Sequence, residues 1–500
     1  MIRCQKVDFF NGFRLYKVDY WHLTDLGCIF DAGAAEESGR NKIIVARPDK
    51  EYNFDMSNIA EKIAYLVDQK GGRTFFVGGF VRDKILGIEN KDMDIEVHGV
   101  KPEILFEILS EVGEPLSYGS SFGVYSLQGY DIDIAMPRKE HATGKGHRDF
   151  EVFVDPFIGT AEAARRRDFT MNAIMEDVLT GEIVDPFGGM QDLKKGIIRH
   201  IDPDTFVEDP LRVLRGAQFA SRFGFAVADE TSELFSSMDL SALSRERVED
   251  ELKKALIKGK RPSVFFEVLR SAGGLNVWFP EVKSLIGIEQ DPKYHPEGDV
   301  WTHTMEVLDR AAEYRNKTKN PYAFMLLALT HDFGKAVTTE RVNGRIHAYN
   351  HETEGLPVIE TFLRRITNES EVISYVLNMV PLHMKPNVAT ASKSAVKVTN
   401  RMFDRACEPE DLIYFAMSDK PVMSGDNPFI GDPEFLFERY EVYKETMAKP
   451  YVTGRDLIEA GLEPGEYFAD ILAYAHKLRL AGIEKESALK QTLSYARKKK

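Results

Sequence analysis

The chain has 500 residues and a formal net charge of −14, from 65 Lys and Arg against 79 Asp and Glu. Hydrophobic residues make up 43% and charged residues 29%, a composition that excludes wholesale disorder. At about 150 residues per domain, this length predicts roughly three domains. The acidic balance argues against non-specific coating of nucleic acid, which depends mainly on Lys and Arg, but it permits a local basic site.

The cysteine content and the hydropathy of the chain indicate the cellular compartment in which it is expected. Cys4, Cys28 and Cys407 are odd in number and far apart, so they predict neither a disulfide framework nor a cysteine-based zinc site. No apolar run approaches the ~18–20 residues of a membrane-spanning helix, and the first ten residues lack a signal-peptide pattern. We therefore expect a reduced, cytoplasmic protein with no membrane contact and no obligatory protein partner.

Taken in chain order, the predicted elements change character twice. The pieces CIFDAG and KIIVARP in the first 55 residues favour strands, but this segment has no chemical motif and no assigned role. Residues 58–70 predict an amphipathic helix with Ser57 as its N-cap. From residue 71 to about 200 strands and helices alternate, and SFGVYSLQ with YDIDIAM predicts a hairpin. From Asp209 onward the pattern is almost entirely helical.

A glycine turn followed by two carboxylates is the most informative stretch. Gly78 and Gly79 end a strand and begin a helix, where missing Cβ atoms let a phosphate approach backbone N–H groups. Arg82, just inside this helix, could bind phosphate oxygens bidentately. Asp92 and Asp94 are two residues apart on a strand, so their carboxylates share a face and could hold Mg²⁺. Two such ions could activate a hydroxyl nucleophile and neutralise a leaving pyrophosphate.

The alternative to a site is an ordinary turn beside a solvated strand edge. A lone glycine pair or a lone Asp-x-Asp favours that alternative, but their combination within about 20 residues favours a site. Asp131 and Asp133 also share a strand face, beside Arg138, and Asp133 is the preferred third acidic ligand. A polar strand edge remains the competing interpretation there.

Four motifs together resemble the class II tRNA nucleotidyltransferase (CCA-adding) and bacterial poly(A) polymerase family. They occur in the family's order: GGFVRDKILG with KDMDIE, RRRDFTMNAI at 165–174, DPFGGMQDLKKGIIRHI at 185–201, and EDPLRVLRGAQFASRFGF at 208–225. The resemblance implies an α+β fold, with a polymerase-β-type nucleotidyltransferase head of mixed sheet and helices, followed by a largely all-α body. It also implies that Asp92 and Asp94 hold catalytic Mg²⁺.

The arginine run predicts a triphosphate contact. Arg166, Arg167 and Asp168 precede a helix expected to begin near Thr170, whose N-terminus would favour an anion. Asp168 could accept a hydrogen bond from a ribose hydroxyl, and Asn172 lies close by in sequence. The alternative is a solvated charged face.

The segment that begins at Glu208 predicts a helix start that could read a base. Asp209 is the expected N-cap, and Arg212 and Arg215 continue the same face. Cytosine and adenine present an amino donor beside a ring-nitrogen acceptor, whereas guanine and uracil present the opposite order. A fixed carboxylate–guanidinium pair would therefore accept C and A and reject G and U. The resemblance assigns this role to Asp209 and Arg212, with Glu208 and Arg215 in support; helix-end ion pairs are the alternative.

A spaced series of histidines and aspartates on helical segments predicts a second metal site: His303, His331, Asp332, His351, His383 and Asp419. Imidazole and carboxylate ligands together suit divalent transition metals or Mg²⁺. The series resembles the HD phosphohydrolase domain, which is fused to this nucleotidyltransferase architecture in other members. The resemblance implies core ligands at His303, His331, Asp332 and Asp419.

By the same resemblance, His351 and His383 extend this site or bind phosphate, and the identity of the divalent metal is left open. The implied reactions are hydrolysis of 2′,3′-cyclic phosphates and of 2′-phosphates, with a metal ion activating water. A domain retained only for structure is the alternative.

These observations predict addition of C, C and A to the 3′ end of tRNA from CTP and ATP, with a second, metal-dependent phosphohydrolase activity. The alternatives are a poly(A) polymerase, a partial CC- or A-adding enzyme, or an HD hydrolase with an RNA-binding head. tRNA binding should be local and salt-dependent, through Arg245, Arg247, Lys253 and Lys254. Residues 139–160 are expected to form a mobile loop that assists the change from C to A, or a plain surface connection.

The predicted division has five parts. They are an N-terminal segment, the nucleotidyltransferase head, a helical nucleotide-selecting and tRNA-binding region, the HD domain and a helical tail, at residues 1–55, 56–200, 201–290, 291–425 and 426–500.

Overall fold

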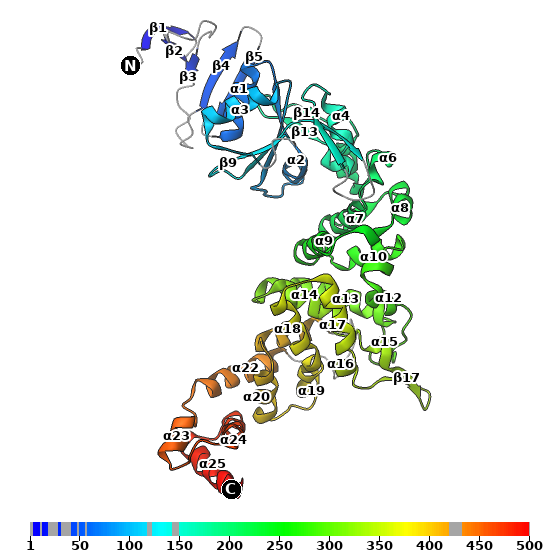
Figure 1. Ribbon diagram of the computed structural model, residues 1–500, viewed down its shortest axis with the longest axis vertical. Helices are drawn as coiled ribbons and strands as arrows, with labels where there is room; N and C mark the ends of the chain where they lie inside the picture. The colour runs from blue at the N-terminus through cyan, green and yellow to red at the C-terminus, as the bar shows by residue number, and fades with distance from the viewer. Residues whose placement is uncertain are drawn as a thin grey trace. The chain divides into compact units, whose positions relative to one another are not determined.

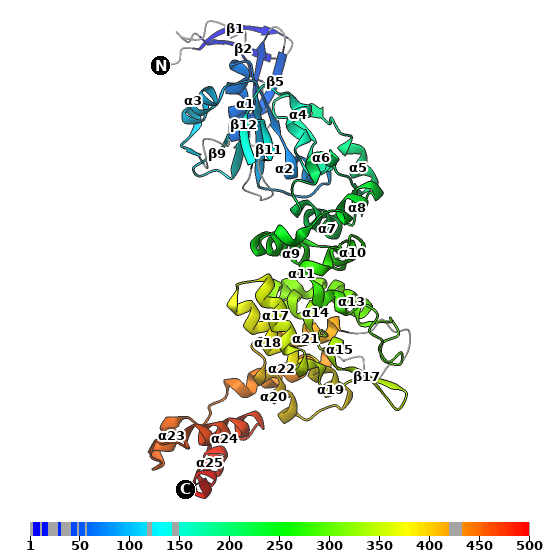
Figure 2. The same cartoon turned by 45° about the vertical axis from the view of Figure 1, so that its right-hand side comes forward.

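The computed structural model divides into two compact units (Figures 1 and 2). The first comprises Met1–Arg212 with Ala226–Leu234, and the second comprises Val213–Phe225 with Phe235–Lys500. The backbone is described for residues 4–10, 13–18, 29–31, 42–47, 50–55, 58–117, 123–142, 150–419 and 433–499, and side chains for 58–116, 123–138, 153–419 and 433–498. The boundary expected at 425/426 lies outside these residues, and the five-part division stays a prediction.

The first unit begins with an antiparallel five-stranded sheet in the order β1-β2-β3-β4-β5. Its strands are β1 (Cys4–Phe10), β2 (Phe13–Val18), β3 (Ile29–Asp31), β4 (Lys42–Arg47) and β5 (Lys50–Asp55). The two strands expected from CIFDAG and KIIVARP are confirmed as β3 and β4.

A seven-stranded mixed sheet forms the centre of the head, in the order β14-β13-β6-β7-β10-β9-β8. Its strands are β6 (Arg73–Phe76), β7 (Met93–His98), β8 (Pro115–Ser117), β9 (Val124–Leu127), β10 (Ile132–Ala135), β13 (Met175–Asp177) and β14 (Ile183–Val184). β7 and β10 pair in parallel, whereas β9 and β10 form the antiparallel pair predicted from the sequence.

Along the chain, helices precede, connect and follow these strands. They are α1 (Ile59–Gln69), α2 (Gly78–Ile85), α3 (Pro102–Val112), α4 (Thr160–Arg165), η1 (Thr170–Asn172), α5 (Gly189–Lys195) and α6 (Pro203–Phe206). α1 packs against α3 and β6, and its buried stripe includes Ile59, Ile63 and Val67 (Figure 1). α2 packs against η1 and β7, so the helix that begins at the glycine turn lies beside the carboxylate-bearing strand.

Three local expectations are corrected. Ser57 lies outside the described residues, and the α1 N-cap is Asn58, whose Oδ1 accepts from the Ala60 N–H at 3.0 Å. The helix expected near Thr170 is the single 3₁₀ turn η1, because the chain returns to the sheet as β13 and pairs with β6. Much of the segment expected as a loop at 139–160 instead forms the antiparallel pair β11 (Arg138–Ala142) and β12 (Phe150–Val154), and residues 143–149 lie outside the described part.

The second unit is helical, as predicted. Two of the divisions between the units fall within helices, one in α7 (Leu211–Phe223) and one in α8 (Asp229–Ser236). In the first unit, β15 (Ile197–Ile198) pairs in parallel with β16 (Ala226–Val227). The following helices are η2 (Leu240–Ala242), α9 (Arg245–Lys258), α10 (Ser263–Ser271), α11 (Leu275–Trp278), α12 (Pro280–Ser284), α13 (Val300–Tyr314), η3 (Arg315–Lys317), α14 (Pro321–Thr330), α15 (Lys335–Thr338), α16 (His351–Glu354), α17 (Leu356–Ile366) and α18 (Ser370–Met379).

Beyond α18 lie η4 (Val380–Leu382), α19 (Lys385–Ala391), α20 (Val396–Arg405), α21 (Pro409–Ser418), α22 (Pro433–Ala448), α23 (Gly454–Glu459), α24 (Phe468–Leu480) and α25 (Lys485–Lys499). A two-stranded hairpin, β17 (Thr339–Val342) with β18 (Arg345–Ala348), interrupts them. α14 packs against α13 and α18, and it is apolar and buried around its circumference because neighbours cover every face. Within the described residues, none of the helices combines the length and hydropathy needed to cross a membrane.

Candidate functional sites

Three predicted carboxylates lie near one another where β7 and β10 run side by side. Asp94 and Asp133 are partners in the parallel register, so their side chains leave the same face of the sheet. Burial and the charge of Asp133 raise the pKa of Asp94 to about 6, although Arg167 lowers it, and Asp92 adds to the rise. Such mutual repulsion is relieved by a cation, and oxygen-only ligands suit Mg²⁺.

The glycine turn lies directly against these acids. Gly78 opens α2 with a φ of +63°, in the left-handed region that favours glycine. A Cβ at Gly78 would lie 3.2 Å from Nη1 of Arg167 and 3.7 Å from Oδ2 of Asp94. A Cβ at Gly79 would lie 3.5 Å from Nη2 of Arg82. The helix start, an arginine and a carboxylate therefore meet at one point on the head.

Three predicted nucleotide-binding side chains form a buried hydrogen-bonded chain. Arg82 donates from Nη1 to Oδ1 of Asn172 at 2.7 Å and from Nε to Oδ1 of Asp83 at 2.8 Å. Asn172 in turn donates from Nδ2 to Oδ1 of Asp168 at 2.8 Å. This chain joins α2 to η1 and holds the glycine turn in place. A direct contact of Arg82, Asp168 or Asn172 with a nucleotide stays a prediction.

Glu96 is a charged residue of the head that the sequence interpretation missed. It is fully buried on β7, two residues after Asp94, and its Oε2 accepts from Nη2 of both Arg166 and Arg167 at 3.3 Å. Burial would raise the pKa of Glu96, but His98 and the two arginines lower it to about 2. The alternation of Asp-x-Asp-x-Glu along one strand face was the signal that could have found it.

The predicted base-reading residues lie beside the arginine run. Oδ1 of Asp209 accepts from the N–H of Leu211 at 3.1 Å, as a helix cap does. Arg212 donates from Nη1 to the carbonyl of Thr205 at 2.7 Å and from Nη2 to the carbonyl of Arg166 at 2.8 Å. Two hydrogen bonds thus fix the Arg212 guanidinium, and its position is tied to the segment that contacts Glu96.

The supporting residues are placed differently. Glu208 is exposed, and the guanidinium of Arg215 lies 5.4 Å from the ring centroid of Phe219. Three of the basic residues expected to bind tRNA have carboxylate partners: Arg245 with Glu246, Lys253 with Glu369 and Lys254 with Glu251, at 3.1, 2.7 and 2.8 Å. Their contact with tRNA stays a prediction.

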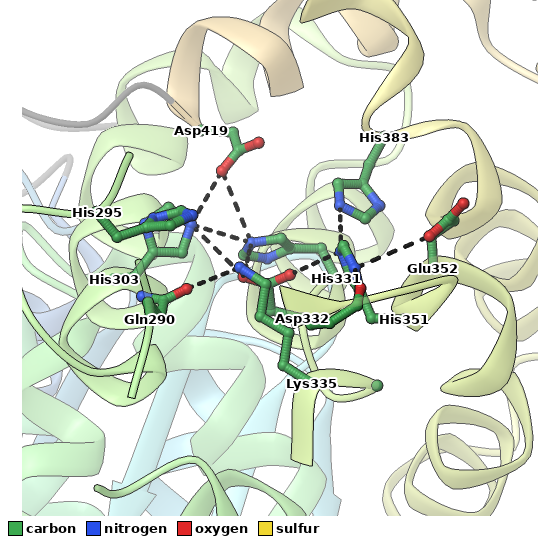
Figure 3. A network of polar contacts seen from close by, with 12 residues as sticks. Gln290, His295, His303, His331, Asp332, Lys335, His351, Glu352, His383 and Asp419 are labelled. Atoms are coloured by element: carbon green, nitrogen blue, oxygen red, sulfur yellow. Dashed lines mark hydrogen bonds and ion pairs between the residues drawn. The ribbon is translucent and has the colours of Figure 1, made fainter. Parts of the chain in front are cut away.

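All six predicted ligands of the second site gather in one cluster (Figure 3). They come from five segments: His303 from α13, His331 and Asp332 after α14, His351 from α16, His383 after η4, and Asp419 after α21. The close approach of α16 to the turn after α14 depends on Gly334, since a Cβ there would collide with the carbonyl oxygen of His351.

Asp332 lies between two groups of imidazoles. Its Oδ2 is 3.2 Å from Nε2 of His331 and 3.6 Å from Nε2 of His303, while its Oδ1 is 3.3 Å from Nε2 of His351. Nε2 of His351 is also 3.3 Å from Nε2 of His383. In the group that contains His303 and His331, Oδ1 of Asp419 lies 3.0 Å from Nε2 of His303. Two triads within this cluster have spacings that could hold a metal ion.

The hydrogen bonds around the histidines turn one nitrogen of each ring toward the centre. In His331, His351 and His383, Nδ1 lies 2.9, 2.9 and 2.7 Å from the backbone carbonyl three residues earlier. A carbonyl only accepts, so Nδ1 carries a proton, and in the neutral ring Nε2 has its lone pair directed at the cluster, where a metal ion could accept it. His303 instead pairs through Nδ1 with the carboxylate of Glu297 at 2.7 Å, an arrangement common behind metal-bound histidines.

The charges of this cluster fit a cation. Burial would lower the pKa of His303, but hydrogen bonds to Asp419 and Glu297 raise it to about 9. Burial would raise the pKa of Asp419, but His303 and His331 lower it to about 2. The carboxylate of Asp332 is fully buried, and its two oxygens lie between the imidazoles of His331 and His351 and the ammonium group of Lys335. Imidazole and carboxylate donors of this kind suit a divalent transition metal.

The sequence interpretation missed two polar neighbours of the cluster. Nζ of Lys335 lies 2.7 Å from Oδ2 of Asp332 and donates to Oε1 of Gln290 at 2.8 Å. Lys335 stands three residues after Asp332, one helical turn away, which was the available signal. A cavity of about 470 Å³ opens onto the ligands and onto Lys335.

Comparison with known proteins agrees with this architecture. A family model described as the poly A polymerase head domain matches residues 74–199. The multifunctional CCA protein of Nitrosococcus oceani is 35% identical over 408 residues, covering 80% of this chain and 95% of the relative. That of Nitrosospira multiformis is 38% identical over 315 residues, covering 62% and 73%.

Solved structures show the same fold at lower sequence identity. The Thermotoga maritima CCA-adding enzyme complexed with tRNA has a TM-score of 0.60 at 22% identity, over 89% of this chain and 96% of that one. The Bacillus stearothermophilus CCA-adding enzyme in complex with CTP has a TM-score of 0.61 at 22% identity, over 88% and 97%.

The mixed-sheet head with its carboxylates, followed by a helical body, is that of a template-independent nucleotidyltransferase. The chain belongs to the poly(A) polymerase/tRNA nucleotidyltransferase family, in the group of the multifunctional CCA proteins.

Proposed function

We propose that this protein adds C, C and A to the 3′ end of tRNA, using CTP and ATP. The observation that carries the proposal is the placing of Asp94 and Asp133 in register beside the glycine turn, in a chain of this family. The relatives' names support the substrates, because CCA-adding enzymes were solved with tRNA, with ATP and with CTP.

In the head, Asp92, Asp94 and Asp133 would hold Mg²⁺, which when bound favours ionisation of the attacking hydroxyl and stabilises the pyrophosphate. The terminal ribose oxygen of tRNA forms a bond to the α-phosphorus as the α–β phosphoanhydride bond breaks. The N–H groups at Gly78 and Gly79, together with Arg167, would orient the triphosphate.

Base choice would fall to Asp209 and Arg212. The Arg212 guanidinium donates hydrogen bonds to two backbone carbonyls. It cannot rotate to suit an incorrect base without breaking these hydrogen bonds. Asp209 offers acceptors and Arg212 offers donors, a pattern complementary to C and A. Guanine or uracil would leave buried polar groups unpaired.

For the second site we propose a metal-dependent phosphohydrolase that removes 2′-phosphates and opens 2′,3′-cyclic phosphates. His303, His331, Asp332 and Asp419 would hold the divalent metal, with His351 and His383 extending the site; when bound, the metal lowers the pKa of water. Water oxygen bonds to phosphorus, the bond from phosphorus to the ribose oxygen breaks, and that oxygen takes a proton. Lys335 would neutralise the phosphate. The cytoplasmic location and the lack of an obligatory protein partner stay predictions.

A pair of variants tests both activities. Asp94→Asn should reduce Mg²⁺-dependent nucleotide incorporation into tRNA lacking CCA at least ~100-fold, because a proposed carboxylate ligand of the Mg²⁺ is lost. The same variant should leave hydrolysis of adenosine 2′-phosphate unchanged. His331→Ala should do the reverse.

Asp131→Asn, an exposed acid near Asp133, and His476→Ala, outside the cluster, are the matched controls. Loss of both activities in either single variant would contradict two independent sites, and an unaffected Asp94→Asn would overturn the head assignment.

A further inference from the structure

The cavity over the histidine–aspartate cluster has a wall that the proposed hydrolysis does not require. Its inner side consists of predicted ligands and Lys335, which suffice for a phosphate group. The rest of its lining, the outer wall, includes aromatic and apolar side chains together with polar ones such as Glu289, Asp291 and Asn387; the aromatic and apolar members are Tyr294, Ile346, His347, Tyr349, Met384 and Val388. The cavity volume of about 470 Å³ lies within the range of small-molecule sites, so it leaves room beside the phosphate for a larger group.

Large apolar side chains stay exposed around this opening. Tyr349 is 59% exposed and Val388 is 61% exposed, and Met384 and Tyr294 are also exposed. Exposed apolar groups gathered at one cavity mark a binding surface more often than isolated ones do. Met384 directly follows the predicted ligand His383 in the sequence. This part of the surface therefore has a fixed position next to the histidine–aspartate cluster.

His347 and Tyr349 form a flat stack at the end of β18. Their ring centroids are 4.8 Å apart and their planes differ by 9°. The carbonyl of Ala348, between them, accepts from Nδ1 of His351 at 2.9 Å. The stack is therefore held at a defined position relative to a predicted metal ligand. The hairpin turn that precedes it, Asn343 and Gly344 with φ of 51° and 78°, fixes the strand that presents the two rings.

A third aromatic side chain, Tyr294, comes from the loop before α13. Nζ of Lys293 lies 5.2 Å from the ring centroid of Tyr294. The next residue, His295, contacts Glu297, whose carboxylate also holds His303. The stacked pair is thus linked through the backbone to His351, and Tyr294 is linked through His295 and Glu297 to His303.

Flat aromatic faces beside a phosphate site suit a nucleobase, because every base has a π-face and stacking tolerates all four. Sugar phosphates and small alkyl phosphates have no such face. We propose that His347, Tyr349 and Tyr294 form a subsite on which the nucleobase of the substrate stacks, so that these side chains set the affinity of the second site for phosphoesters that carry a base. This inference rests on the proposed phosphohydrolase function and adds to it the residues that hold the base of the substrate.

Two substrates that differ in the base test this subsite. Adenosine 2′-phosphate carries a base, and glycerol 2-phosphate is a secondary alkyl phosphate without one. For Tyr349→Ala in the full-length protein, KM for adenosine 2′-phosphate should rise roughly 5- to 150-fold, the loss expected for one stacked base, with kcat little changed. Both constants for glycerol 2-phosphate should stay at wild-type values, and Tyr349→Phe should restore the wild-type KM.

A binding measurement gives a readout that does not depend on the metal. Calorimetric titration of chelator-treated protein with adenosine 2′-phosphate should show the same fold-loss for Tyr349→Ala and none for Tyr467→Ala, an exposed tyrosine between α23 and α24. Equal effects on both substrates, or no loss of binding, would overturn the subsite and leave the hydrolase proposal standing. If the wild type hydrolyses neither substrate, the hydrolase proposal fails, and the titration still decides whether a base is bound.

Discussion

At the scale of single residues, Glu96 explains how two arginines are held beside the acids of the head. Asp94 needs nearby positive charge when no metal is bound, and Arg167 supplies it. The same arginine donates to Glu96, and so does Arg166, whose carbonyl accepts from Arg212. Glu96 therefore links β7, which carries Asp94, to the start of α7 through the guanidinium groups of Arg166 and Arg212, without touching a nucleotide in the proposed mechanism.

Glu96→Gln should lower nucleotide incorporation roughly 10- to 100-fold, because a buried charge-assisted hydrogen bond contributes about 1.5–3 kcal/mol. KM for both CTP and ATP should rise, since the arginines predicted to contact the triphosphate lose a charged hydrogen-bond acceptor. Steady-state kinetics with each nucleotide measures this, and hydrolysis of adenosine 2′-phosphate is the internal control. Unchanged kinetics for both nucleotides would show that Glu96 does not position these arginines.

The sequence allowed most of the proposed site residues to be named but not their surroundings. Asp92, Asp94 and the histidine–aspartate series have spacings tied to chemistry, so they were predicted. Glu96 escaped because strand alternation gives the face of a residue but not whether that face is buried at that point. The predicted contact of Arg82 with phosphate stays a prediction. Its hydrogen bonds to the adjacent Asp83 and to Asn172, which is distant in sequence, could not be predicted from a local pattern.

At the scale of elements, α21 is joined to α18 by a buried polar contact. The hydroxyl of Tyr375 donates to Oδ2 of Asp411 at 2.7 Å. Burial, with the nearby Glu408 and Glu410, raises the pKa of Asp411 to about 6, although the Tyr375 hydrogen bond lowers it. Asp411 therefore binds its proton more tightly in the folded state than in the unfolded state. The stabilisation from this contact is complete only at a pH below the pKa that Asp411 has in the unfolded chain. Its contribution falls as the pH rises through the folded pKa.

Asp411→Asn keeps an acceptor for Tyr375 and removes the charge. The variant should therefore be more stable than the wild type at pH 8, by about 1–3 kcal/mol, and the difference should shrink as the pH falls toward 4. Thermal unfolding midpoints of both proteins between pH 5 and 8 measure this dependence. A variant that is less stable at pH 8, or a difference that does not change with pH, would contradict the raised pKa.

Element prediction succeeded where patterns were long and failed where they were short. The helical body and the β9–β10 pair followed from periodicity. The 3₁₀ turn at Thr170 was predicted as a helix, because the pairing of β13 with the distant β6 could not be seen locally. The hairpin β17–β18 was missed although Asn343-Gly344 is a strong turn signal. That omission mattered, since the hairpin leads into the aromatic wall of the second site.

At the scale of the whole molecule, the two candidate sites lie in two different compact units. The acids of the head lie in the first unit and the histidine–aspartate cluster lies in the second. The order of the motifs along the sequence also assigns the two sites to different domains, within a five-part division that stays a prediction. The net charge of −14 says little about tRNA binding, since most phosphate contacts depend on local positive charge.

The central claim is that Asp209 and Arg212 choose each nucleotide without a template. The direct measurement is incorporation of each of the four nucleotides into tRNA that lacks CCA, by the wild type and by Arg212→Ala. The wild type should add C, C and A, and ATP alone with tRNA ending in CC should give a single A. Arg212→Ala should lose activity and its discrimination against G and U. Incorporation of G or U by the wild type as readily as C and A, or a long tail from ATP alone, would contradict the account.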